Sequence, residues 1–289
     1  MKIGTIGVGF VGGATAKILN SKHEVYLYDK YKAPINNKEC LETIAKEAEA
    51  IFICVPTPMQ VSGAIDYTNI HSSICDLLQA VEKAGRNPND ILIIIRSTAV
   101  SGTTDKLSQK YPFRFAFNPE FLREKYALED MQNTNRVVIG ANDTRSLEQV
   151  ESIYKPIFPN AKYILTDAKT AEMVKYMANG MLTGQIALAN EFYQICKAMD
   201  IDYNTVKNTI LLDDRIGRNL DVPGHDGRLG YGGKCLIKDI NALIHVAREH
   251  DYRPYLLEEV WRLNEKVRED KDWLDIEGAT SNNNFRETN

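Results

Sequence analysis

Two hydrophobic patterns alternate along the first half of the chain. Short apolar runs are typical of buried strands, and between them apolar residues recur at helical spacing. This alternation predicts a parallel sheet with helices on both faces, a Rossmann-like α/β fold. The expected strands are 2–6, 24–28, 50–55, 91–95, 113–117 and 136–139, and the expected helices run from the first glycine cluster to about residue 20 and over 69–84, 103–109 and 143–154.

The pattern changes at about Asp167. Residues 168–199 keep a helical periodicity without a proline, and helical patterns follow at about 204–212, 236–247 and 255–273. No strand signal of comparable strength appears in this part. We therefore expect an α/β domain of residues 1–166, an all-helical domain of residues 167–275 opened by one long helix, and a disordered polar tail of residues 276–289.

A glycine cluster follows the first expected strand directly, and the second strand ends at Asp29. The stretch Gly7-Val8-Gly9-Phe10-Val11-Gly12 therefore has the context of a dinucleotide-binding fingerprint. In this fingerprint Gly7 makes the turn, Gly9 admits the pyrophosphate and Gly12 lets the helix pack closely on the strand. Asp29 would accept hydrogen bonds from the adenosine ribose and repel a 2′-phosphate, which favours NAD over NADP. The neighbouring residues Lys30 and Lys32 weaken this preference.

Polar residues and prolines follow three of the expected strands. They are Val55-Pro56-Thr57-Pro58, Arg96-Ser97-Thr98 and the segment from Asn118 to Glu124. Ligands of open α/β sheets bind beyond the carboxyl ends of the strands, so the three segments together predict a lined cleft. Ordinary turn chemistry is the alternative for any one of them.

Three glycines precede a cysteine in the stretch from Gly230 to Cys235. The apolar spacing after it is helical, so Cys235 should lie in the first turn of a helix, where a thiol loses its proton more easily. Lys238 and Asp239 follow three and four positions later, which gives a nucleophile with a cation and a possible base on one face. The alternative is a small core residue under a glycine-rich loop.

Lys175 and Asn179 share one face of the expected long helix, because they are four residues apart. A lysine in such a place is usually solvated and an asparagine is usually incidental. The two residues gain a chemical meaning only if their face of the helix meets Cys235.

Composition narrows the choice of function. The chain has 289 residues, enough for two cores, and 44% hydrophobic with 26% charged residues is ordinary for a globular protein. A net charge of -4 gives no electrostatic reason to expect nucleic acid or a membrane surface as a partner. Five cysteines without a CxxC pair suit reduced thiols in a cytoplasm, and we expect no signal peptide and no metal site.

The motifs together resemble those of the nucleotide-sugar 6-dehydrogenases, the family of UDP-glucose dehydrogenase and GDP-mannose dehydrogenase. The likeness extends from Met1 to about Trp273. It rests on the six-residue glycine motif, on Val55 to Pro58, Ser97-Thr98 with Gly102-Thr103, Asn118 to Glu124, Lys175 with Asn179, Arg215-Ile216-Gly217, and Gly230 to Asp239.

The resemblance implies a four-electron oxidation that uses NAD twice. The C6 alcohol of a nucleotide sugar, UDP-glucose first among them, becomes an aldehyde, which a cysteine captures as a thiohemiacetal. A second oxidation gives a thioester, and hydrolysis releases the uronic acid, UDP-glucuronate in the case of UDP-glucose.

The resemblance also implies roles for individual residues. Cys235 is the expected nucleophile, Lys175 and Asn179 hold the oxyanion, and Asp239 and Glu120, with Thr98, handle proton transfer and hydrolysis; which carboxylate is the base stays open. The expected cofactor contacts are Gly7, Gly9, Phe10, Val11, Gly12, Asp29, Val55, Pro56, Thr57, Thr98, Glu124 and Lys238. The expected substrate contacts are Phe121, Leu122, Arg123, Glu124, Lys175, Asn179, Arg215, Tyr231 and Gly232.

One feature departs from the family. Its members usually continue into a third domain that closes over the nucleotide, and this sequence ends at Asn289. A partner chain could supply that domain, the substrate could be smaller, or the activity could be diminished.

Two other functions stay open, a two-electron hydroxyacid dehydrogenase of the 6-phosphogluconate or 3-hydroxyisobutyrate type and a non-catalytic NAD-binding relative. Family members pair through the central region, so a homodimer through the helical domain is expected.

Overall fold

The protein divides into two compact units. The computed structural model describes residues 1–217, 220–276 and 278–280. The first unit contains residues 1–57 and 67–175, and the second contains residues 58–66 and the chain from Tyr176 onward. The observed division differs from the predicted boundary between residues 166 and 167 in two ways. The start of the long helix, up to Lys175, belongs to the first unit, and the short segment 58–66 belongs to the second.

The first unit is built on a seven-stranded sheet with the strand order β2-β1-β3-β4-β5-β6-β7. Strands β1 to β5 are parallel, β6 runs antiparallel to β5, and β7 is parallel to β6. The predicted Rossmann-like sheet is therefore confirmed. The strands are β1 Lys2–Ile6, β2 Glu24–Tyr28, β3 Ala50–Ile53, β4 Leu92–Ile95, β5 Arg114–Phe117, β6 Arg136–Gly140 and β7 Lys162–Thr166. Strand β7 was not predicted, because this edge strand leaves most of its side chains partly exposed and its pattern is weak.

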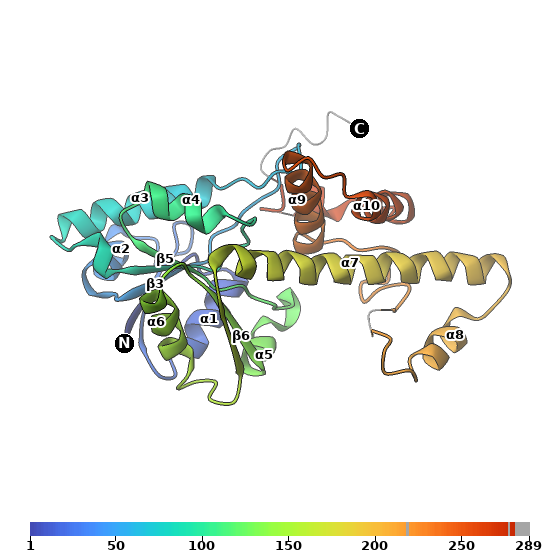
Figure 1. Cartoon of the computed structure of the whole chain (residues 1–289), viewed down its shortest axis with the longest axis horizontal. Coiled ribbons are helices and arrows are strands. Elements are labelled where there is room, and N and C mark those ends of the chain that lie inside the picture. Colours follow the sequence, from blue (N-terminus) through green and yellow to red (C-terminus); the bar gives the residue numbers. More distant parts are fainter. Residues whose placement is uncertain (218–219, 277, 281–289) are drawn as a thin grey trace. The chain divides into compact units, whose positions relative to one another are not determined.

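Helices cover both faces of this sheet (Figure 1). In β4, Ile93 and Ile95 pack into one apolar cluster, and Leu92 and Ile94 pack into the other. Each such buried side chain contributes about 1.5–3 kcal/mol. The first cluster holds α2 Lys38–Glu47, α3 Thr68–Lys83 and α4 Thr103–Lys110, and the second holds α1 Phe10–Leu19, α5 Ala127–Gln132 and α6 Thr144–Tyr154, with 3-10 turns η1 Pro88–Asp90 and η2 Glu124–Tyr126 between elements. Helix α2 was not predicted.

The second unit is helical where the structure describes it. Helix α7 starts in the first unit and continues into the second, and α9 begins at Cys235, as predicted. Helix α10 ends at Val267, although its pattern predicted a helix to Trp273, because Arg268 has an extended backbone with ψ 110°. The helices are α7 Ala168–Ala198, α8 Tyr203–Ile210, α9 Cys235–Glu249 and α10 Tyr255–Val267, followed by the 3-10 turn η3 Asp272–Leu274.

The segment 58–66 is part of the second unit and pairs with its last described residues. The Met59 N–H donates to the Ala279 carbonyl at 2.9 Å, and both side chains are buried. Of the predicted disordered tail, residues 276 and 278–280 are thus folded into this unit, whereas residues 277 and 281–289 lie outside the described residues. Among the described helices, none combines the length and apolar character needed to cross a membrane.

Candidate active site

The glycine turn between β1 and α1 has the shape that a dinucleotide requires. Gly7 has φ 87°, a conformation that favours glycine, and a Cβ on Gly12 would lie 1.9 Å from the Gly7 carbonyl oxygen. A Cβ on Gly9 would meet no heavy atom within 4 Å, so this position opens onto space. Gly9 is also the N-cap of α1, whose first N–H groups can bind an anion. The turn therefore fits a pyrophosphate, with Phe10 and Val11 in the first turn of the helix.

Asp29 ties the end of β2 to this turn. Its carboxylate accepts hydrogen bonds from the Val8 N–H at 2.7 Å and from the Tyr31 N–H at 3.0 Å. The Lys32 ammonium donates to the Val8 carbonyl at 2.5 Å. An acid and a lysine therefore both lie at the turn, where the adenosine ribose is expected to bind.

The ends of β3 and β4 are linked by side chains. The Thr57 hydroxyl donates to the Thr98 carbonyl at 3.0 Å, and the Ser97 hydroxyl donates to the Val55 carbonyl at 2.7 Å. Thr57 is buried, Thr98 is half-buried, and Pro56 between the linked residues is exposed. The structure thus brings together the predicted residues of two neighbouring strand ends.

Glu120 and Lys175 form a buried ion pair in the first unit. Lys175 Nζ lies 2.8 Å from Glu120 Oε1, and the two side chains are 6% and 7% exposed. Burial works against the charged carboxylate, but attraction to Lys175 and hydrogen bonds from Lys175 and the Leu122 N–H hold the pKa of Glu120 below its usual range. Lys175 Nζ also lies 5.8 Å from the centre of the Phe121 ring. The pair therefore offers an ammonium and a carboxylate side by side.

Glu120 lines a cavity of about 300 Å³, together with three predicted substrate residues, Phe121, Leu122 and Arg123. Arg123 is tied to Asp130 at 2.6 Å. Glu124 is exposed and starts the 3-10 turn η2. The segment that follows β5 is thus partly inside the cavity wall and partly at the surface.

In the second unit, the carboxylate of Asp239 accepts two side-chain hydrogen bonds. It accepts hydrogen bonds from Asn179 Nδ2 at 2.5 Å and from Lys238 Nζ at 2.6 Å, and it is only 1% exposed. Lys238, which was predicted to contact the cofactor, is itself buried against this carboxylate. A carboxylate, an ammonium and an amide therefore meet near the start of α9.

Cys235 is the first residue of α9 and is half-buried. The N-cap is Lys234, a residue whose side chain has no oxygen to accept the first helical N–H groups. Tyr231 is buried, and burial raises the pKa of its hydroxyl above the ordinary value. Arg215, predicted to contact substrate, is exposed and paired with Asp213 at 2.5 Å.

Sequence reasoning missed the residues that hold the turn before Cys235. Asn190, Asn264 and Asp272 accept hydrogen bonds from its backbone, and Arg268 pairs with Asp272. The available signal was the four-residue spacing of Asn264, Arg268 and Asp272, which resembles the solvated face of a helix.

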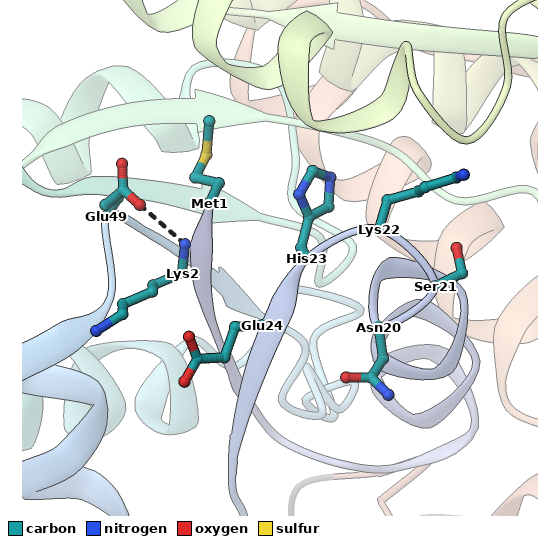
Figure 2. Close-up of a pocket in the computed structure, with 8 residues that line it drawn as sticks. All are labelled: Met1, Lys2, Asn20, Ser21, Lys22, His23, Glu24 and Glu49. Carbon is teal, nitrogen blue, oxygen red and sulfur yellow. Dashed lines mark hydrogen bonds between the residues drawn. The ribbon is translucent and has the colours of Figure 1, made fainter.

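A depression of about 770 Å³ lies at the amino ends of β1, β2 and β3 (Figure 2). It is lined by Met1, Lys2, Glu24 and Glu49 at the amino ends of strands, and by the segment 20–23. Ligands of parallel sheets bind at the carboxyl ends, so we do not assign the active site to it.

The doubly wound sheet and the open glycine turn define a protein of the dinucleotide-binding class. The chain belongs to the UDP-glucose/GDP-mannose dehydrogenase family: residues 35–158 match the NAD binding domain of this family and residues 169–266 match its central domain. The predicted resemblance and the predicted cofactor are thereby confirmed. The glycine turn precedes the matched range, so its assignment rests on its own geometry.

Individual relatives agree with this assignment. The UDP-glucose 6-dehydrogenase of Rickettsia felis is 34% identical over 227 residues, which cover 76% of this chain and 48% of that protein. YtcA of Bacillus subtilis is 31% identical over 92% of this chain and 68% of its own length. The structure of a UDP-glucose dehydrogenase from Pyrobaculum islandicum matches with a TM-score of 0.79 at 28% identity, over 92% of this chain and 68% of that one. This chain spans about half the length of the Rickettsia relative.

Proposed function

We propose that this protein oxidises the C6 alcohol of a nucleotide sugar to the uronic acid with NAD, and that UDP-glucose is its substrate. The observation that carries the proposal is that each unit holds one buried carboxylate in an ion pair with a lysine: Glu120 in the first unit and Asp239 in the second. Both stand at positions that the family resemblance assigns to chemistry. The relatives named as UDP-glucose dehydrogenases support the choice of sugar nucleotide.

The first part of the reaction removes two electrons from the alcohol. When bound, one NAD would accept a hydride, the carbon-bound C6 hydrogen with its two electrons, in each of the two oxidations. The alcohol proton passes to a carboxylate, Asp239 or Glu120. Lys175 and Asn179 donate hydrogen bonds to oxygen where negative charge develops. The product of this step is the C6 aldehyde.

The second part runs through the Cys235 sulfur. The thiolate adds to the aldehyde carbon, a carbon–sulfur bond forms, and the carbonyl π bond becomes an oxyanion. Loss of two more electrons and the carbon-bound hydrogen gives a thioester. Water then attacks its carbonyl carbon, the carbon–sulfur bond breaks, and the acid leaves with the thiol restored. Thr98 helps to place the attacking water by a hydrogen bond, and a carboxylate, Asp239 or Glu120, accepts the proton of that water.

A comparison of two neutral variants can assign the base. Glu120→Gln removes the carboxylate that pairs with Lys175, and Asp239→Asn removes the carboxylate that pairs with Lys238. The variant of the true base should lose turnover of the alcohol yet still oxidise the aldehyde supplied directly. The other variant should fail mainly at hydrolysis and accumulate the thioester, which mass spectrometry detects on the Cys235 peptide.

We also propose that two copies of the chain pair through the helical unit. One face of α7 carries exposed apolar residues at helical spacing, which is unusual for a solvated helix. They are Met177, Met181, Leu188, Phe192, Ile195 and Met199, each 46% to 64% exposed. Phe192→Glu should shift the mass seen by sedimentation from dimer to monomer, and Glu191→Gln on the same helix is the control.

The decisive experiment counts the NADH formed for each acid produced from a panel of nucleotide sugars. Two NADH per acid are expected. Cys235→Ser should produce no acid, because serine is a poorer nucleophile and leaving group than a thiolate, and Cys75→Ser on α3 is the matched control.

Two results would replace the proposal. One NADH per substrate, with turnover that survives alkylation of Cys235, would favour the two-electron hydroxyacid dehydrogenase. NAD binding without turnover of any sugar in the panel would favour the non-catalytic relative.

A further inference from the structure

Within the part of the chain that the structure describes, residues 230–233, which form the turn before Cys235, make no backbone–backbone hydrogen bond. Gly230 and Gly233 have φ 69° and 70°, so the chain turns twice within four residues. Its shape must therefore come from contacts with other parts of the second unit. Those contacts come from side chains, and they can be followed residue by residue.

The side-chain amide of Asn264 forms hydrogen bonds with both the backbone N–H and the backbone carbonyl of Tyr231. Asn264 Oδ1 accepts from the Tyr231 N–H at 2.8 Å, and Asn264 Nδ2 donates to the Tyr231 carbonyl at 3.0 Å. Asn264 is 2% exposed, so both bonds are shielded from water. A side-chain amide can make both bonds at once, because it carries a donor and an acceptor side by side. Asn190 adds a third bond by accepting from the Gly230 N–H at 2.9 Å.

Gly233 is held by a carboxylate. Its N–H lies 3.1 Å and 3.2 Å from the two oxygens of Asp272. Asp272 is in turn paired with Arg268 at 3.1 Å. Because Gly233 is two residues before Cys235, this bond sets the direction in which the chain enters α9.

Arg268 organises the acids around this turn. Its side chain is 1% exposed and lies within 3.1 Å of three carboxylates, those of Asp226, Asp270 and Asp272. Arg228 also pairs with Asp270. A buried guanidinium with fixed partners forms a rigid anchor, because its five N–H groups have a fixed geometry.

Gly232 shows how closely the turn lies against this anchor. A Cβ at this position would stand 2.4 Å from Arg268 Nη2 and 2.5 Å from Asp272 Oδ1. The glycine is therefore needed for contact with the anchor itself. Its φ lies outside the left-handed region, so backbone conformation is not the reason.

We propose that Asn264, Arg268 and Asp272 are positioning residues that fix the turn from Gly230 to Lys234 and thereby set the reactivity of the Cys235 thiol. The inference rests on the proposed function only in giving that thiol a catalytic purpose. It assigns a role to residues that lie 29 or more positions after the cysteine in the chain, where no motif marks them.

The test measures alkylation of Cys235 by iodoacetamide in the folded protein, without substrate or cofactor. Mass spectrometry follows the Cys235 peptide, and the exposed Cys75 serves as the internal reference. Asp272→Ala should slow alkylation of Cys235 at pH 7 by roughly tenfold relative to Cys75. The turn then no longer holds the thiol against the first N–H groups of α9, which favour the reactive thiolate. The pH of half-maximal alkylation should rise in the same variant.

A graded series separates positioning from general stability. Asp272→Asn keeps an acceptor for the Gly233 N–H and should recover part of the rate, while Asn264→Asp loses the bond to the Tyr231 carbonyl and should behave like Asp272→Ala. Arg262→Gln is the control, because this arginine is exposed and pairs with Glu259 on its own helix, α10. Thermal melting of every variant is recorded alongside.

The outcomes separate this inference from the proposed function. Unchanged alkylation of Cys235 in folded Asp272→Ala and Asn264→Asp would overturn the positioning role. Slower alkylation with no oxidation of any nucleotide sugar by the unaltered protein would overturn the proposed function and leave the positioning role standing. If Asp272→Ala does not fold, Asp272→Asn and Asn264→Asp decide the matter alone.

Discussion

Two glycine turns lead into helices in this protein, and they differ in what packs against their glycines. The turn from Gly7 to Gly12 is packed against main chain: the Gly7 N–H donates to the Tyr28 carbonyl at 2.9 Å, and the next strand lies against it at Cys54. The turn from Gly230 to Gly233 is held by side chains of Asn190, Asn264 and Asp272.

The difference determines what each turn tolerates. A turn packed against backbone cannot make room, because moving a strand or a helix disturbs the whole sheet. A turn packed against side chains can make room, but it then loses the contacts that define it. The first turn should therefore fail by loss of folding or cofactor binding, and the second by loss of alignment.

The largest effect should come from Gly12→Ala. The new methyl group would lie 1.9 Å from the Gly7 carbonyl oxygen, so α1 must move away from β1. We expect a loss of roughly 3 kcal/mol or more in the free energy of unfolding and no measurable NAD binding by calorimetry. Gly13→Ala, whose Cβ would be 4.0 Å from the nearest atom, is the control and should be neutral or slightly stabilising.

The two units should also differ in their response to pH. Burial raises the pKa of Glu172 in the first unit to about 7, against hydrogen bonds from Thr104 and the Gly102 N–H. An unfolded glutamate titrates near 4.5, so between these values the folded state binds more protons and the free energy of unfolding falls as the pH rises, by about 3 kcal/mol at most. In the second unit, burial opposes the charge of Asp226, but Arg268 keeps the pKa of that carboxyl below its usual range. Its contribution is therefore lost only on acidification.

Tryptophan fluorescence can follow one unit alone. Trp261 and Trp273 are the two tryptophans of the chain, and both belong to the second unit. From pH 5 to pH 8 their melting should change little, while circular dichroism reports a first unit that weakens. Glu172→Gln should flatten that trend. Coincident transitions at every pH would mean that the two units unfold as one block and do not differ in their response to pH.

A smaller effect is expected from Gly232→Ala. The added methyl group meets the ends of the Arg268 and Asp272 side chains, which can shift where backbone cannot. We expect a loss of roughly 2 kcal/mol in the tryptophan-monitored transition. A loss as large as that of Gly12→Ala would contradict the distinction between the two turns.

The smallest effect should come from Gly233→Ala. A Cβ here meets no atom within 4 Å, and only the φ of 70° opposes it. The expected loss is roughly 1 kcal/mol, the strain of a left-handed alanine. If thermal melting shows a larger loss than for Gly232→Ala, backbone conformation rather than contact with the anchor limits this turn.

Features with a local signature could be predicted from the sequence. The first turn follows a buried strand and precedes a helix, so the task of each of its glycines follows from the order of residues alone. Cys235 could be placed at a helix start because the apolar spacing changes directly after it. The long helix α7 carries an unbroken periodicity, and it was predicted to within a residue at its end.

Features that depend on distant contacts could not. Asn264 and Arg268 follow an amphipathic pattern that continues to Trp273, so no local signal ends the helix at Val267. The ion pair of Arg268 with Asp226 joins residues 42 positions apart. The pairing of Glu120 with Lys175 was not predicted, because the two residues are 55 positions apart and no local pattern links them.

The early segment 58–66 has a consequence for anyone who wishes to dissect the protein. Met59 packs in the same apolar cluster as Ile237 and Ile240 of α9. A polypeptide excised at Tyr176 would leave a hole in that cluster and an unmatched edge at Ala279. The helical half is thus not self-contained, and expressing it alone calls for a grafted copy of the missing stretch or for co-expression of the two halves.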